Sequence, residues 1–318
     1  MLNQLKSNIL RLKYNFFGVL IKFFLRYNFF YLCSLVIKFN LKKIKKIKSH
    51  NTKKKIIVLA KSGGYEDLIA CYENSDISNS IEYFTLPRSL IKAIYNFYLS
   101  SSAYEDYLTL QTDTETTKKN NQYKLALEKI FFFLDKNWKF DGLIGFNIFY
   151  RAEHNVYEII NKINKKSIVI HKESVAPEAE SKRNEIIYKK NEKFKGNKIS
   201  VYSYNEKELL EKTEIAKPDQ IAVNGCPRLD VALRYQKTLS NQNTILYFMI
   251  EKERVIPGEN PLVNWSSLKT KTDNYLINYA KNNPKINIIF KGKIGIHKRK
   301  ELPKNLPSNC KFINFGIG

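Results

Sequence analysis

The feature that most constrains the fold of this chain is a series of three short apolar runs, each followed by a polar or glycine-bearing loop. They occupy residues 167–174, 198–204 and 220–230, and a segment of helical composition, residues 206–215, separates the last two. Runs of four to seven residues rich in Ile, Val and Tyr are typical of strands buried on both faces. The order strand, loop, strand, helix, strand therefore predicts an open parallel sheet.

Ligands of open parallel sheets bind beyond the carboxyl ends of the strands, where His171 and Glu173 would lie. A histidine there can bond a hydroxyl or a phosphate, and a carboxylate can act as a general base, so we take both as candidate catalytic residues. The alternative, which the spacing leaves open, is that backbone groups satisfy His171 and that Glu173 caps the loop.

Glycine-bearing loops supply further candidate binding residues. Gly63 and Gly64 follow the first predicted strand and let backbone amides approach a ligand closely, although a plain tight turn has the same pattern and no G-x-G-x-x-G is present. Gly225 precedes Arg228 and Asp230; Arg228 can pair with Asp230 or reach a phosphate bidentately. The structural alternative is an Asp N-cap with an arginine clamp.

Strands and helices alternate from residue 55 to about 235, which predicts a doubly wound, Rossmann-like α/β domain over residues 55–240. Residues 100–122 carry no apolar periodicity and predict a surface loop, and residues 181–197 predict a solvated excursion between strands. The further strands are expected at 55–60, 81–86 and 142–146, and the helices at 87–99, 124–138 and 154–163.

A second series follows a polar linker at 239–244, with strands at 244–250, 286–291 and 311–315 and a helix at 273–281. It predicts a partial second Rossmann-like domain over residues 241–318, as if the chain were cut short. Lys291, Lys293 and His297 lie in a loop where glycines alternate with cations, which suits a nucleotide diphosphate. A solvated basic loop is the competing interpretation.

Residues 1–54 predict a basic, amphipathic helical arm. Fourteen of the 54 Lys and Arg residues and no acidic residue lie in 1–55, while the whole chain has a net charge of +24. Residues 2–40 place a narrow polar stripe on an otherwise apolar helix, and lysines follow it. Because each basic residue near an anionic leaflet contributes about 1 kcal/mol, we expect this arm to lie on the inner face of the cell membrane. Packing on the protein's own body is the alternative.

Other classes of function find little support. The four cysteines form no C-x-x-C pair and only four histidines are present, so the sequence predicts no zinc site and no disulfide, and a reducing cytoplasm is expected. No metal and no cofactor are expected. The domains lack the interleaving of aromatic and basic residues that nucleic-acid binding requires, so nucleic acid is not an expected partner.

Taken together, the Gly63–Gly64 loop, the strand ending in His171 and Glu173, and the Val-Asn-Gly-Cys-Pro-Arg-Leu-Asp sequence at 223–230 resemble the GT-B superfamily over roughly residues 55–318. The resemblance is to bacterial surface-carbohydrate biosynthesis glycosyltransferases, and more distantly to UDP-N-acetylglucosamine 2-epimerases and CDP-glycerol glycerophosphotransferases. It departs from the epimerases, in which Pro-Glu-Glu and an arginine follow the His-x-Glu stretch after a longer insert.

The resemblance implies two Rossmann-like domains, with an acceptor on the first and a nucleotide-activated sugar on the second, and no bound metal. It implies Gly63 and Gly64 at the floor of the cleft between the domains, Glu173 as base or sugar contact, and Lys291, Lys293 and His297 near the donor phosphates. The expected function is transfer of a sugar or a glycerol-phosphate-like group to a glycan or lipid-linked acceptor in surface polysaccharide biosynthesis. A UDP-sugar 2-epimerase-like enzyme and a non-catalytic, membrane-associated fragment are the alternatives.

Overall fold

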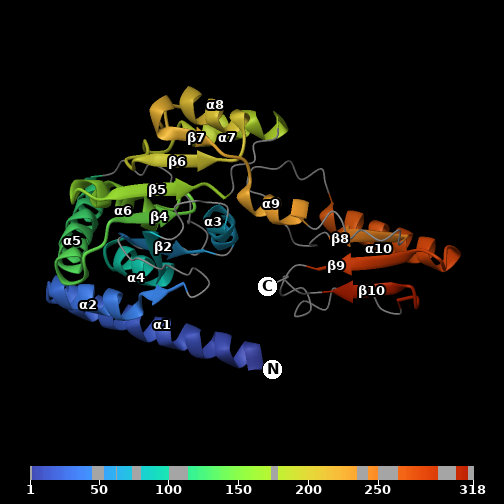
Figure 1. Ribbon diagram of the computed structural model, residues 1–318, viewed down its shortest axis with the longest axis horizontal. Helices are drawn as coiled ribbons and strands as arrows, with labels where there is room; N and C mark the ends of the chain where they lie inside the picture. Colours follow the sequence, from blue (N-terminus) through green and yellow to red (C-terminus); the bar gives the residue numbers. More distant parts are fainter. Residues whose placement is uncertain are drawn as a thin grey trace. The chain divides into compact units, whose positions relative to one another are not determined.

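The computed structural model describes residues 2–44, 54–61, 63–73, 80–99, 114–172, 178–234, 243–249, 264–292 and 306–313. The candidate residues Glu173, Lys293 and His297 lie outside these ranges. The chain forms two compact units, Met1–Arg234 and Tyr235–Gly318 (Figure 1).

A seven-stranded sheet organises the first unit. Its order is β1-β3-β2-β4-β5-β6-β7, and every strand is parallel to its neighbours except the short edge strand β1. The strands are β1 (Lys42–Lys43), β2 (Lys54–Ala60), β3 (Ile81–Pro87), β4 (Gly142–Gly145), β5 (Lys166–Ile170), β6 (Lys198–Val201) and β7 (Ile221–Val223). The expected α/β fold class is confirmed, and the chain order reverses between β2 and β4.

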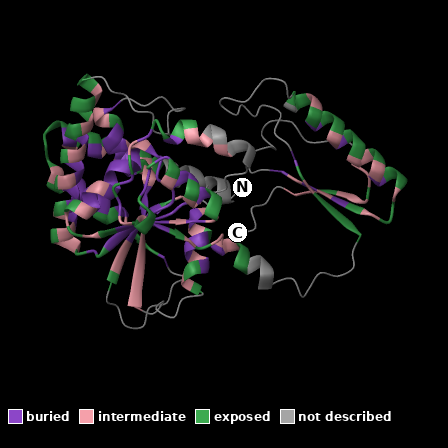
Figure 2. Ribbon diagram, turned by 90° about the horizontal axis from the view of Figure 1, so that it is seen from above, coloured by how far each residue is buried: buried purple, intermediate pink, exposed green. Residues whose placement is uncertain are grey.

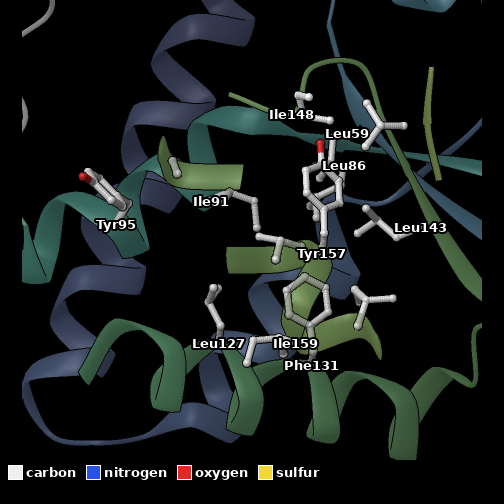
Figure 3. Close-up of a cluster of buried hydrophobic side chains, with 14 of the residues drawn as sticks. Leu59, Leu86, Ile91, Tyr95, Leu127, Phe131, Leu143, Ile148, Tyr157 and Ile159 are labelled. Atoms are coloured by element: carbon white, nitrogen blue, oxygen red, sulfur yellow. The ribbon is translucent and has the colours of Figure 1, made fainter. Parts of the chain in front are cut away.

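Helices cover both faces of this sheet, as in a doubly wound fold. Alternate residues of β2 face two different cores: Ile57 and Leu59 join the large cluster beneath α4, α5 and α6, and Val58 joins a smaller one that includes Leu68 of α3. Figure 2 shows buried residues concentrated along these strands, and Figure 3 shows the large cluster around Tyr157. The helices are α3 (Gly64–Glu73), α4 (Arg88–Tyr98), α5 (Thr114–Trp138), α6 (Arg151–Lys162), α7 (Glu178–Tyr188), α8 (Tyr204–Lys212) and α9 (Pro227–Arg234).

One predicted loop is partly helical, so that prediction was wrong: helix α5 begins within the expected loop at 100–122. The excursion expected at 181–197 lies between β5 and β6, and its first part is the end of helix α7, which was not predicted. The first turns of α5 are mostly exposed, and α7 buries only Tyr188 among its described side chains. The start of α5 and the whole of α7 therefore lack the apolar stripe that would predict a helix. Ion pairs between side chains four residues apart, such as Lys119 with Glu115 and Lys189 with Glu185, support helix there instead.

The N-terminal segment forms two helices rather than one, α1 (Leu2–Arg26) and α2 (Phe30–Asn40), with Asn28 at φ 57° between them. Helix α1 packs on α4, where a Cβ on Gly18 would lie 3.4 Å from the Ala93 Cβ, and α2 packs on α5. Both helices therefore belong to the first unit. Among the helices that the structure describes, none combines the length and hydropathy needed to cross a bilayer.

The second unit is a small parallel sheet with one described helix. Its strands, β8 (Thr244–Phe248), β9 (Asn287–Lys291) and β10 (Cys310–Ile313), are ordered β10-β9-β8, and α10 (Trp265–Asn282) contacts β9. Met249, Ala280, Ile288 and Phe290 form its buried core. This core is separate from those of the first unit.

Candidate functional site

The candidate site lies at the carboxyl edge of the first sheet. Parallel doubly wound sheets bind ligands where the strand order reverses, because the connecting loops diverge there and leave the strand ends uncovered. In this sheet the reversal falls between β2 and β4. The loop after β2 contains Gly63 and leads into α3 at Gly64.

Both glycines are required by close packing or by backbone conformation. Gly63 has φ +82°, and a Cβ on it would lie 3.3 Å from Arg228 Nη1 and 3.8 Å from Lys172 Cδ. A Cβ on Gly64 would lie 2.2 Å from Phe146 Cγ, so the start of α3 is in direct contact with the residue that follows β4. Three strand ends thus converge on this loop.

An ion pair between α3 and α9 fixes the geometry of the loop. Arg228 donates from Nε to Asp67 Oδ1 at 2.8 Å and from Nη2 to Asp67 Oδ2 at 2.6 Å. Tyr202, after β6, donates to Asp67 Oδ2 at 2.5 Å and accepts from Arg228 Nη2 at 2.6 Å. Asp67 is fully buried, so this network holds the charge of the carboxylate away from water.

The same network shifts the pKa values of Tyr202 and Arg228, and it does not include the Nη1 donor of Arg228. Burial and the bonds to Asp67 raise the pKa of Tyr202, and the bonds to Asp67 raise the pKa of Arg228 although burial opposes them. Arg228 Nη1 makes no hydrogen bond to the described residues and points toward Gly63, on a side chain 33% exposed. Arg228 is therefore a clamp that can also bind an anion.

Further cationic side chains directly follow the neighbouring strands β2 and β3. Lys61 follows β2, with its Nζ 4.9 Å from the Tyr150 ring, and Arg88 lies 4.1 Å from the same ring while pairing with Glu153. We call Lys61, Lys172 and Arg228 the cationic edge. Their positive charges, at strand ends near the Gly63 turn, suit a phosphate or another anion.

His171 lies inside the protein, 1% exposed, after β5. Its Nε2 is 3.7 Å from Glu206 Oε1, and Tyr188 donates a hydrogen bond to the same oxygen at 3.0 Å. Burial raises the pKa of the Glu206 carboxyl to about 7, against the lowering effect of the Tyr188 bond. His171 and Glu206 thus form a buried pair of an imidazole and a carboxyl group beside the edge.

The structure describes three further predicted site residues, Gly225, Asp230 and Lys291. A Cβ on Gly225, at φ +71°, would meet nothing within 4 Å, and Asp230 is exposed in the first turn of α9. Arg228 pairs with Asp67 rather than with Asp230, and Asp230 is not the N-cap. Lys291 ends β9 in the second unit. Within the described ranges, no group of His, Cys, Asp and Glu side chains could hold a metal ion.

Sequence reasoning missed Asp67, Tyr202, Lys61 and Glu206. Asp67 had one signal, an acidic residue in the first turn of a helix after a glycine turn, which favours the helix N-terminus. Its partner lies 161 residues away, and no local pattern indicates that pairing.

No protein-family model matches the chain, and no curated protein matches it in sequence. Among solved structures, it resembles a UDP-GlcNAc 2-epimerase from Neisseria meningitidis bound to UDP-GlcNAc, at 11% identity and a TM-score of 0.44, over 82% of this chain and 72% of that one. A likeness at this level carries no argument about chemistry.

Proposed function

We propose that this chain is a nucleotide-sugar-dependent enzyme of the glycosyltransferase type. The observation that supports it is the cationic edge: Lys172 and Arg228 approach Gly63 from separate strand ends, at the point where strand order reverses. Fixed cations there would stabilise a phosphate-bearing substrate and a leaving diphosphate without a covalent nucleophile.

The proposed roles follow the expectations from sequence. Glu173, directly after Lys172, is the proposed general base. Lys291, Lys293 and His297 are proposed to contact donor phosphates, and the proposed acceptor is a glycan or lipid-linked group. His171, whose Nε2 is 3.7 Å from Glu206 Oε1, would position Glu173, which follows it by two residues in the sequence.

Ligand binding tests the anion site directly. Thermal shift and calorimetry with UDP, UDP-GlcNAc, GDP-mannose and CDP-glycerol should find at least one ligand that stabilises the chain. Lys172→Ala should weaken that binding about tenfold, since a charge-assisted bond is lost. Lys190→Ala, which changes an exposed lysine just after the end of α7, is the matched control and should leave binding unchanged. Absence of any shift, or equal losses in the two variants, would reject the proposal.

Turnover tests the assigned base. With the ligand that binds, Glu173→Gln should retain affinity while turnover falls by about two to four orders of magnitude, because only proton transfer is removed. Unchanged turnover would remove Glu173 from the mechanism and leave the binding proposal standing.

A further inference from the structure

Helix α1 carries two apolar faces, of which the protein buries only one. Ile21 and Leu25 are buried and Gly18 lies against α4. The opposite side presents Leu12, Phe16, Val19, Phe23 and Tyr27, spaced by four, three, four and four residues, so they form one stripe along the helix. Their exposed fractions range from 52% to 68%.

This stripe continues beyond the end of α1. The Phe23 and Tyr27 rings are 5.2 Å apart, and Tyr27 stacks on Phe29 at 5.9 Å. Phe29 in turn lines an apolar groove between α2 and α5, whose other walls include Leu125 and Phe132. We call Leu12, Phe16, Val19, Phe23, Tyr27 and Phe29 the apolar face. A contiguous exposed surface of this kind marks an interaction site rather than scattered surface residues.

The charges beside the apolar face indicate what covers it. Lys22 and Arg26 are exposed on one flank of the stripe and Lys13 on the other. The first 55 residues contain no acidic side chain. Apolar and aromatic side chains bordered by cations match the acyl and headgroup layers of an anionic bilayer. A second copy of this chain would instead bring like charges together across the interface.

We propose that the apolar face docks this protein in the plane of an anionic lipid bilayer, with α1 lying along the interface. The exposed face enters the headgroup and acyl boundary, while Gly18, Ile21 and Leu25 keep α1 on the body of the protein. The docking surface therefore belongs to the folded first unit, and it does not depend on the proposed enzymatic function.

Vesicle co-sedimentation of the 318-residue chain tests the proposal, with phosphatidylcholine vesicles containing or lacking 30% phosphatidylglycerol. Binding should require the anionic lipid and weaken as salt rises. The double variant Phe16→Ser with Phe23→Ser should bind at least tenfold more weakly. The double variant Lys22→Gln with Arg26→Gln should lose roughly thirtyfold, since each cation near the surface contributes about one factor of five.

Ile186→Ser is the matched control, because Ile186 is 60% exposed on α7, away from α1. It should bind vesicles as the unsubstituted chain does, and circular dichroism should show that all variants stay folded. Failure of the unsubstituted chain to bind, or equal binding by the Phe16→Ser, Phe23→Ser variant, overturns the proposal. A dimer in analytical ultracentrifugation that this variant dissociates, without vesicle binding, would assign the face to a second copy.

Discussion

At the scale of single residues, Asp67 is the one that organises the candidate site. Its carboxylate, contributed by α3, accepts bonds from Arg228 on α9 and from Tyr202 after β6. Three segments are thus held together around Gly63 by one buried charge. This explains why Arg228 lies at the site, paired with Asp67 rather than with Asp230.

Asp67→Asn should destabilise the protein by about 2 kcal/mol, because the paired charge is lost and Arg228, which is one-third exposed, can partly rehydrate. Urea unfolding followed by circular dichroism measures the change. Asp230→Asn, an exposed carboxylate on the same helix as Arg228, should change stability by less than about 0.5 kcal/mol. Similar losses in both variants would contradict the assigned pairing.

Glu206 should give the protein a pH-dependent stability. Its folded pKa of about 7 lies above the ordinary value of 4.5, so the folded state binds the proton more tightly than the unfolded state. The resulting stabilisation is complete below pH 4.5 and is lost as pH rises through 7, a change of about 3 kcal/mol at most.

Glu206→Gln removes that titration while keeping an acceptor for the Tyr188 hydroxyl. Between pH 5 and pH 8, the urea midpoint of the unsubstituted protein should fall relative to that of the variant. Parallel pH profiles for the two proteins would show that Glu206 does not titrate in this range.

At the scale of elements, two glycines lie at contacts between neighbouring elements, Gly145 where β4 meets α6 and Gly18 where α1 meets α4. A Cβ on Gly145 at the end of β4 would lie 2.0 Å from the Tyr157 hydroxyl of α6, a side chain that is fully buried. A Cβ on Gly18 of α1 would lie 3.4 Å from the Ala93 Cβ, which is close to ordinary contact. The same substitution therefore has opposite consequences at the two positions.

Gly145→Ala should destabilise the first unit by about 1–3 kcal/mol through overpacking. Gly18→Ala should stabilise it by about 0.5–1 kcal/mol, because alanine reduces the freedom of the unfolded chain and favours helix. Thermal unfolding of both variants checks these signs. A loss at Gly18 as large as that at Gly145 would mean that α1 and α4 pack more tightly than the contact distance indicates.

At the scale of the whole molecule, the two units have separate cores. The first unit buries its large cluster around the seven-stranded sheet, and the second has a small core around Phe290. Since no residue belongs to more than one of these clusters, we expect the first unit to fold without the second.

Residues 1–234 expressed alone should give a dispersed amide spectrum and a cooperative thermal transition, as expected for a domain with its own core. The spectrum of the 318-residue chain is the reference, and its signals from the first unit should largely overlay. A collapsed, broad spectrum for residues 1–234 would show that the second unit is needed for folding.

Much of the fold was predictable from the sequence, because each strand or helix of a parallel α/β protein has its own apolar pattern within a short segment. The apolar runs at 55–60, 81–86 and 142–146 match β2, β3 and β4 to within one residue at either end, because the interior residues of all three strands are buried or half-buried on both faces. Helix α7 was not predicted, because it buries few side chains and so shows no periodic apolar pattern. Ion pairs of Glu185 with Lys189 and Lys212 stabilise it instead.

The sequence by itself determined the α/β class, the position of the Gly63–Gly64 turn at a strand end and the cationic character of the N-terminal segment. Only the tertiary structure decided that Asp67 holds Arg228 and that His171 faces Glu206 inside the protein. It also decided which side of α1 packs on α4. The physical reason is that hydrophobic periodicity records whether a side chain prefers water or a core, whereas the partner it meets there depends on the contacts of segments far apart in the chain.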